Sequence, residues 1–595
     1  MRVGLFACSA LLSAAAACAV IATIVNAETT TAEPAKPVAT AEVTATIDQT
    51  LAKVWAEQKV TPAKPAGDEE FLRRVYFDTV GVPPTAEEAA KFLDDKAGDK
   101  RAKLVDAQLA DARFGRHMAD QWVPILMGRG SRNKGSSHDL LAVWMAEQFN
   151  KNRDFGQVAY DIITASGGMS DNLAVAYWAI RREQKVADYA GLISKQFTGV
   201  QIQCAQCHTH PYEKWTMEDF AGVASFFQPV QIRSNNNIAP VAISVVDQRV
   251  RKRPQAEKPK RPEDVRYYEP KYLGGESVAI NDSTLWRSAY AKWVIGSENT
   301  QTHRYLVNRF WSFLFGSAFV NPVDDFNSIN KVQHPELLET LARDFAASKY
   351  DVKRFYRIVM NSRAYQLAGS GAKRAEGAVE AWMFAEYPVR QLSPEQLFGA
   401  LVTVAADGQI ERDFRREAGN PFTAIRNRQG REGRRGKDTD SMEGEKDNKK
   451  KDKDYDEKSN AVFEKAIEDM TDAWFLRRRL SQAYAAQSSD DEMTEVDGFS
   501  MTIDQALMVM NGLATQTISG TYKGSCLQTI MAQNQSADER VKALFLRLLT
   551  RKPTAPELSR FTDFIARESR SRKADDIYAD VLMALLMTTE FATNH

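Results

Sequence analysis

The residues with the clearest potential for chemistry are Cys204, Cys207 and His208, which form a Cys-x-x-Cys-His motif. This spacing is typical of c-type haem attachment. Two thiols three positions apart on a turn can form thioethers to the two vinyl groups of one haem, and the next residue can supply an imidazole to the iron. The sequence therefore predicts one covalent haem c with His208 as the proximal ligand.

The same cysteines allow other interpretations, which stay open at this point. Cys204, Cys207 and His210 have the spacing of three zinc ligands, and a fourth ligand would have to come from elsewhere. The thiols could instead form a redox disulfide, although no thioredoxin-like strand–helix–strand pattern precedes them. The alternative to a haem protein is thus a structural or binding protein whose Cys-x-x-Cys-x-x-His segment holds zinc or is merely packed.

The ligand on the far side of a haem iron decides between electron transfer and chemistry at an open position. Met169 is our candidate, because it lies 39 residues (208 − 169) before His208 in a Gly-Gly-Met-Ser segment that resembles a flexible loop. Other candidates are Met118, His117 and His138.

A helix is expected directly after the motif. Thr216 and Asp219 have the spacing of a capping box. The apolar residues beyond them recur at helical spacing and could either face a macrocycle or pack in a core, which is the more frequent meaning of such a stripe. They are Phe220, Val223, Phe226 and Phe227.

A second, weaker candidate site is the acidic pair Asp324 and Asp325, with His334 close by in the sequence. Such a pair could bind a metal or perform the acid–base chemistry of a hydrolase. The favoured interpretation is structural, with an aspartate at a turn and His334 preceding a helix that starts with proline. The motifs of serine hydrolases, zinc proteases, nucleotide-binding loops and dinucleotide-binding folds do not occur in the sequence.

Composition and the first residues bear on location and partners. The chain has 595 residues, with 78 Lys plus Arg balanced by 78 Asp plus Glu, so no global basic field marks it as a nucleic-acid binder.

Met-Arg, an apolar run and Val-Asn-Ala at 25–27 predict a secretory signal peptide cleaved after Ala27. An uncleaved anchor and lipidation at Cys18 are the alternatives. We expect an exported protein of the periplasm or cell surface, with no membrane span in the mature chain.

The cysteine count fits this expectation. Three cysteines follow the signal, the two of the motif and the solitary Cys526, and so few do not form a disulfide scaffold in an exported chain of this length.

The predicted architecture is mainly α, with helical domains joined by a short connector that contains strands. Residues 426–460 are almost free of large apolar side chains and predict a disordered charged insertion. The predicted segments are 1–27 (signal peptide), 28–45 (flexible tether), 46–231 (first helical domain, with the motif), 232–275 (connector), 276–425 (second helical domain, first part), 426–460 (insertion) and 461–595 (second helical domain, C-terminal part).

Several stretches, among them QCAQCHTHPY at 203–212 and FLRRVYFDTVGVPPTAEEAAKFL from Phe71, resemble a planctomycete-type family of exported proteins. Those proteins pair a cytochrome-associated domain of unknown function (DUF1549, or PSCyt2) with a second one (DUF1553, or PSD1). The resemblance to the first domain rests on QCAQCHTHPY at 203–212, AGVASFF at 221–227, FLRRVYFDTVGVPPTAEEAAKFL from Phe71 and Arg113-Phe114-Gly115. The resemblance to the second rests on Asn308-Arg309-Phe310-Trp311, Phe315-Gly316, Val323-Asp324-Asp325-Phe326, His334-Pro335-Glu336-Leu337, Ser362-Arg363-Ala364-Tyr365 and the last residues, 589–595.

This resemblance implies helical domains in an exported protein with a Cys-x-x-Cys-His motif, and it implies no settled activity. The chain departs from the usual pattern at Thr209, where many relatives have Asp, and at Gln121-Trp122, where many have His-Trp. A distal role of that family histidine is therefore not transferred to this chain. The expected partners are redox proteins or other cell-surface proteins.

Overall fold

The computed structural model is mainly helical, which confirms the predicted fold class. It describes residues 37–128, 135–182, 184–234, 243–250, 268–278, 280–369, 380–405, 518–520 and 525–595. The predicted signal peptide and the predicted charged insertion both lie outside these residues. Within the described ranges, no helix has the length and apolar character needed to cross a membrane.

Helix α2 begins before the predicted end of the N-terminal tether. The stretch predicted as a tether, 28–45, extends six residues into helix α2, which starts at Thr40 and buries Val43 and Ile47 on one face. The apolar side chains at spacing four along this helix give it a face to bury, and this outweighs the Thr/Ala-rich composition of its first turn. The helices of this part are α2 (Thr40–Glu57), α3 (Asp68–Thr79), α4 (Ala86–Asp94), α5 (Lys100–Ala110) and α6 (Arg113–Met127).

The motif lies in the next group of helices, between α10 and α11. Helix α10 ends at Thr198, and the next residue, Gly199, has a φ of 66°, the left-handed conformation in which glycine commonly follows a helix. The short 3-10 helix η2 follows four residues later and carries the first cysteine. The elements are α7 (Gly135–Asn150), α8 (Phe155–Thr164), η1 (Leu173–Val175), α9 (Ala176–Ala179), α10 (Val186–Thr198), η2 (Gln203–Gln206) and α11 (Met217–Ser225).

A small antiparallel sheet occupies part of the predicted connector. Its order is β1 (Gly167–Gly168), β3 (Ile243–Asp247), β2 (Val230–Ser234), with Gly167 and Ile232 both opposite Val245. The connector strands therefore pair with a strand that precedes the motif, so the sheet is built into the first helical region.

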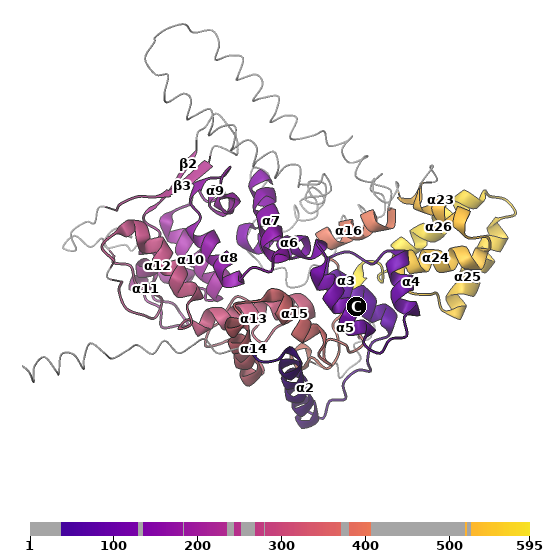
Figure 1. Cartoon of the computed structure of the whole chain (residues 1–595), viewed down its shortest axis with the longest axis horizontal. Coiled ribbons are helices and arrows are strands. Elements are labelled where there is room, and N and C mark those ends of the chain that lie inside the picture. Colours follow the sequence, from indigo (N-terminus) through magenta and orange to yellow (C-terminus); the bar gives the residue numbers. More distant parts are fainter. Residues whose placement is uncertain are drawn as a thin grey trace, which may run out of the picture. The chain divides into compact units, whose positions relative to one another are not determined.

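The second helical region continues from the connector to the C-terminus. In Figure 1 the C-terminus lies beside α3, and strand β5 contacts that helix. The elements are η5 (Ser283–Leu285), α12 (Trp286–Ile295), α13 (Thr300–Phe315), α14 (Pro335–Ala347), α15 (Val352–Met360), η6 (Ala381–Met383), β4 (Arg390–Gln391), α16 (Pro394–Ala405), α23 (Cys526–Gln533), α24 (Ala537–Leu549), α25 (Ala555–Glu568), α26 (Ala574–Leu586) and β5 (Thr593–Asn594).

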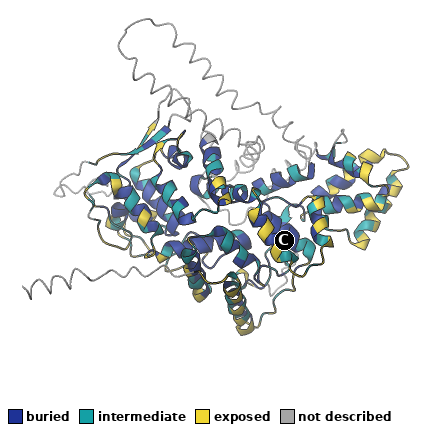
Figure 2. Cartoon of the chain, viewed as in Figure 1, coloured by how far each residue is buried: buried dark blue, intermediate teal, exposed yellow. Residues whose placement is uncertain are grey.

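The hydrophobic core does not follow the predicted domain boundary at 232–275. One core cluster runs from Val43 to Tyr387 and so includes side chains from both sides of the connector. In it, the ring of Trp122 lies 4.8 Å from that of Phe155 and 5.6 Å from that of Phe310. A second cluster joins side chains from 392–405 and 518–591 with Phe77 of α3. Figure 2 shows the buried faces of these helices turned toward one another.

Candidate functional site

The motif begins on η2 and continues to Cys207, the residue directly after it, with both cysteines exposed and one of the two residues between them buried. Cys204 and Cys207 are exposed free thiols, whereas Ala205 is fully buried. On a 3-10 helix the side chains of residues three apart are eclipsed. The turn therefore presents both sulfur atoms on the same, solvent-facing side, which is the arrangement that two thioethers to one ligand require.

Helix α10 packs against η2. The Gln203 side chain of η2 lies over Gly191 of α10, where an added Cβ atom would lie 1.6 Å from the Gln203 Oε1 atom at the flexible end of that side chain. The Gln203 side-chain amide in turn donates a 2.7 Å hydrogen bond to Gln206 Oε1. Behind the turn, the Ala205 N–H donates to the carbonyl of the buried Ile202.

His208 is exposed, and its hydrogen bond defines which ring nitrogen is available. Nδ1 lies 2.7 Å from the Thr209 carbonyl oxygen. Because a carbonyl only accepts, Nδ1 carries the proton, and in the neutral ring Nε2 keeps its lone pair. A metal-bound imidazole is held in the same way, with its other nitrogen donating to a carbonyl or carboxylate.

His210 has the opposite arrangement. Its Nδ1 accepts from the backbone N–H groups of Tyr212 (3.3 Å) and Glu213 (3.1 Å), while the backbone N–H of His210 donates to the Trp215 carbonyl. Because backbone N–H groups only donate, Nδ1 carries the lone pair and the neutral ring is protonated at Nε2. His210 thus holds the turn after the motif together, and binding a metal through Nδ1 would break both of its hydrogen bonds.

Helix α11 begins as the sequence predicts. The Thr216 hydroxyl accepts from the Asp219 N–H and the Asp219 carboxylate accepts from the Thr216 N–H, which completes a capping box. The apolar face beyond it, predicted as either a macrocycle wall or core, is core, since Phe226 is fully buried and stacks on Tyr272 at 5.1 Å. Lys271 of the connector pairs with Asp219 at 2.6 Å and so holds the connector to the start of α11.

Residues of the second helical region hold the segment before the motif. Asp324 is 4% exposed, and its carboxylate lies 3.3 Å from Lys195 Nζ and 3.6 Å from Arg309 Nη2. Next to it, the Phe326 N–H donates a 2.8 Å hydrogen bond to the Gly199 carbonyl at the end of α10. These contacts favour the structural interpretation of Asp324 over a role as an acid or base.

The other two residues of the predicted acidic site also make structural contacts. The Asp325 N–H donates to the Pro322 carbonyl in a turn, and the Asp325 carboxylate accepts from the Asn330 side-chain amide at 3.0 Å. His334 precedes α14, which starts with proline as predicted, and its Nε2 donates to the Trp382 carbonyl at 2.7 Å. Desolvation lowers the pKa of the half-buried His334 below its ordinary value.

The same loop also holds the segment after the motif. The Ser328 N–H donates to the Glu213 carboxylate, and the Ser328 hydroxyl donates to the Tyr212 carbonyl at 3.1 Å. Hydrogen bonds from Ser328 lower the pKa of Glu213. Residues 324–328 therefore contact both flanks of the motif, and the sequence carries no signal for this arrangement because the partners lie more than a hundred positions apart.

Three of the predicted distal ligands, Met169, Met118 and His117, lie in the packed interior, and His138 is half-buried. Met169 is 1% exposed in the hydrophobic core, and its segment is no flexible loop, since Gly167 and Gly168 form β1 and the Met169 N–H donates to the Ile243 carbonyl. Met118 and His117 are buried in α6, and His138 Nε2 lies 3.0 Å from the Gly128 carbonyl oxygen. Met169 would have to leave the core to reach an iron on the exposed face of η2.

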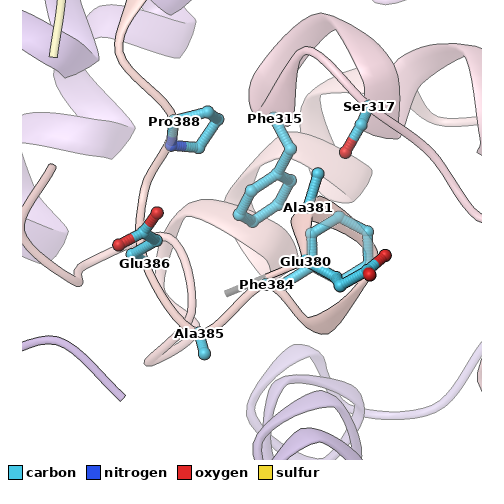
Figure 3. Close-up of a pocket in the computed structure, with 8 residues that line it drawn as sticks. All are labelled: Phe315, Ser317, Glu380, Ala381, Phe384, Ala385, Glu386 and Pro388. Atoms are coloured by element: carbon cyan, nitrogen blue, oxygen red, sulfur yellow. The ribbon is translucent and has the colours of Figure 1, made fainter. Parts of the chain in front are cut away.

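Among the residues that the structure describes, no three His, Cys, Asp or Glu side chains are grouped so that they could hold a metal ion, and Cys204, Cys207 and His210 are thus not gathered into a preformed set. A cavity of about 20 Å³ lies between Phe315, Phe384, Glu380 and Glu386 (Figure 3). That is room for about one water molecule, which is too little for an organic ligand.

Comparisons with known proteins identify two domains. Residues 46–232 match a family described as PSCyt2, a protein of unknown function (DUF1549), and residues 286–565 match PSD1, a protein of unknown function (DUF1553). The chain therefore carries both of the domains that the sequence resemblance predicts. Neither the curated proteins nor the solved structures contain a match.

Proposed function

We propose that the chain is an exported c-type cytochrome-like protein that carries one covalent haem on Cys204 and Cys207, with His208 as the proximal ligand. A bound haem would supply a one-electron redox centre, and the role that follows is electron transfer or support of a redox step. The proposed location is the periplasm or the cell surface, and the proposed partners are redox proteins. Export rests on the signal-like residues 1–27 and fits the motif, because haem is attached covalently outside the cytoplasm.

The observation that carries the proposal is the contrast between the two histidines. His208 donates from Nδ1 to a carbonyl and keeps the Nε2 lone pair that an iron requires, on a turn whose two thiols are exposed on one side. His210 uses its Nδ1 lone pair to hold a backbone turn. The geometry thus supports ligation by His208, the residue of the haem motif, better than ligation by His210, the residue of the zinc alternative.

The test is to express the full chain with a c-type haem-attachment system and to measure its intact mass and visible spectrum. We expect one haem mass, a Soret band and a positive pyridine haemochrome, and the same mass spectrum gives the cleavage position of the signal. Cys204→Ser should remove one thioether, and Cys204→Ser combined with Cys207→Ser should abolish attachment. Cys526→Ala is the matched control, since this thiol is buried elsewhere and should leave attachment intact.

The two histidines give a second comparison. His208→Ala should change the spectrum of the attached haem, whereas His210→Asn should not, because an asparagine oxygen can accept the hydrogen bonds of the turn. A wild-type protein without haem mass would refute the proposal. Stoichiometric zinc that disappears in Cys204→Ser would establish the alternative of a zinc-binding structural protein, and unchanged turnover of candidate substrates in Asp325→Ala would dispose of the hydrolase alternative.

A further inference from the structure

Two large apolar side chains stand exposed beside the motif. Tyr212 is 67% exposed and Ile329 is 60% exposed, whereas most large apolar side chains of the described residues are buried. The first lies four residues after His208 in the PSCyt2 domain, and the second lies in the PSD1 domain. We call these two side chains the Tyr212/Ile329 patch.

Hydrogen bonds join the two loops that carry the patch. Ser328, the neighbour of Ile329, donates its backbone N–H to Glu213 and its hydroxyl to the Tyr212 carbonyl. The segment on the Tyr212 side is only four residues beyond His208, which is at most about 14 Å of extended chain. Tyr212 therefore lies within a distance of the proximal ligand that is comparable with the width of a porphyrin, and the loop that carries Ile329 is hydrogen-bonded to it.

Both backbones are fixed by local contacts. The Asn327 Oδ1 atom accepts from the Ile329 N–H at 2.9 Å and from the Asn330 N–H at 2.7 Å, and His210 accepts from the Tyr212 N–H. A ligand that packs on the patch would thus not have to order the two loops, and this lowers the entropic cost of the contact.

We propose that Tyr212 and Ile329 form an apolar wall against the macrocycle, so that the PSD1 domain contributes to the haem environment. This inference rests on the proposed haem attachment. A porphyrin presents a flat apolar surface, and an exposed aromatic and an exposed branched side chain gain by covering it. The wall would exclude water from one edge of the cofactor, and such a hydrophobic shell controls the solvent access and the dielectric that set a redox potential.

The experiment compares the haem-loaded full chain with Ile329→Ser and Tyr212→Ser by intact mass and by redox titration. Both variants should keep one haem, because neither residue belongs to the attachment motif, and their midpoint potentials should become more negative, because water stabilises the more highly charged oxidised iron. Leu285→Ser is the matched control, since Leu285 is 53% exposed in η5 and should leave the potential unchanged.

The outcomes separate the two proposals. A wild-type protein without haem would overturn both of them. Haem-loaded variants whose potentials equal that of the wild type would overturn the wall and leave the haem proposal intact. Equal shifts in the two variants and in Leu285→Ser would also overturn the wall, because the effect would then not be local.

Discussion

Replacing Asp78 by asparagine should destabilise the protein strongly, because this carboxylate is the centre of a buried network. Asp78 of α3 is 2% exposed. Its Oδ2 accepts from the hydroxyls of Tyr365 (2.8 Å) and Tyr387 (2.7 Å), and its Oδ1 accepts from Arg390 (2.6 Å) and Asn594 (2.7 Å). Burial raises the pKa of both phenols far above the ordinary value, so both hydroxyls remain donors.

The size of the effect follows from these contacts. Removing one partner of a buried ion pair costs about 3–5 kcal/mol, and the lower end applies here because the Arg390 side chain is 21% exposed and water can partly solvate its charge. Asparagine also turns an NH2 group toward two of the four donors, and an unsatisfied buried donor costs about 1–3 kcal/mol. The terms share one network and do not add fully, so we expect Asp78→Asn to lose about 4 kcal/mol or more, a large share of the ~5–15 kcal/mol typical of folded proteins.

Urea unfolding followed by circular dichroism at pH 7 would measure this loss, and hydrogen exchange would locate it. Amides of β4 and β5, which pair next to the network, should exchange faster in Asp78→Asn. The control is Asp111→Asn, because Asp111 pairs with the partly exposed Arg113 and such a surface pair contributes ~1 kcal/mol or less. If Asp78→Asn does not fold, Tyr365→Phe removes one hydrogen bond and should cost about 1 kcal/mol. A loss in Asp78→Asn no larger than that in Asp111→Asn would refute the reasoning.

Three further variants probe other parts of the chain. Gly115→Ala should destabilise the protein by ~1–3 kcal/mol in urea unfolding, because the new Cβ would lie 2.1 Å from the Ala146 carbonyl where α6 crosses α7, and unchanged stability would contradict this packing. His210→Ala should speed hydrogen exchange at the backbone amides that its ring accepts from, whereas His210→Asn should keep them protected. In His334→Asn the unfolding free energy should decrease less between pH 7 and pH 5 than it does in the wild type. Burial depresses the pKa of His334 in the folded protein below the ordinary ~6.5. On acidification the unfolded chain therefore binds the proton first, and the stability that the neutral His334 contributes above about pH 6.5 is lost. An equal decrease of the unfolding free energy in the wild type and in His334→Asn would contradict this prediction.

Local patterns in the sequence predicted the elements that local interactions decide. The capping box at Thr216 and Asp219 is confirmed, and the start of α14 after His334 with proline at its first position is as expected. These features depend on residues within one turn of each other, so their spacing in the sequence is enough to identify them. The apolar stripe of α11 was ambiguous for a physical reason, because a face that packs in a core and a face that packs on a cofactor have the same periodicity.

Contacts between distant segments could not be predicted in this way. The sequence does not show which ring nitrogen of His208 or of His210 carries the proton. The structure shows it, because Nδ1 of His208 faces a backbone carbonyl and Nδ1 of His210 faces backbone N–H groups. In the sequence, Asp78 is one acidic residue of an amphipathic helix. Its hydrogen-bond partners Tyr365 and Asn594 lie 287 and 516 positions away, so the sequence does not show the network.

The two matched domains are separate in the sequence, but in the structure they share one hydrophobic core. The motif belongs to the PSCyt2 domain, yet Asp324 and Ser328 of the PSD1 domain contact its two flanks. The core that supports η2 also includes side chains from both sides of the connector. A PSCyt2 domain expressed alone would keep the Cys-x-x-Cys-His motif but would expose the apolar faces that α13 covers and would leave Lys195 without Asp324. The two domains therefore form one structural unit around the motif.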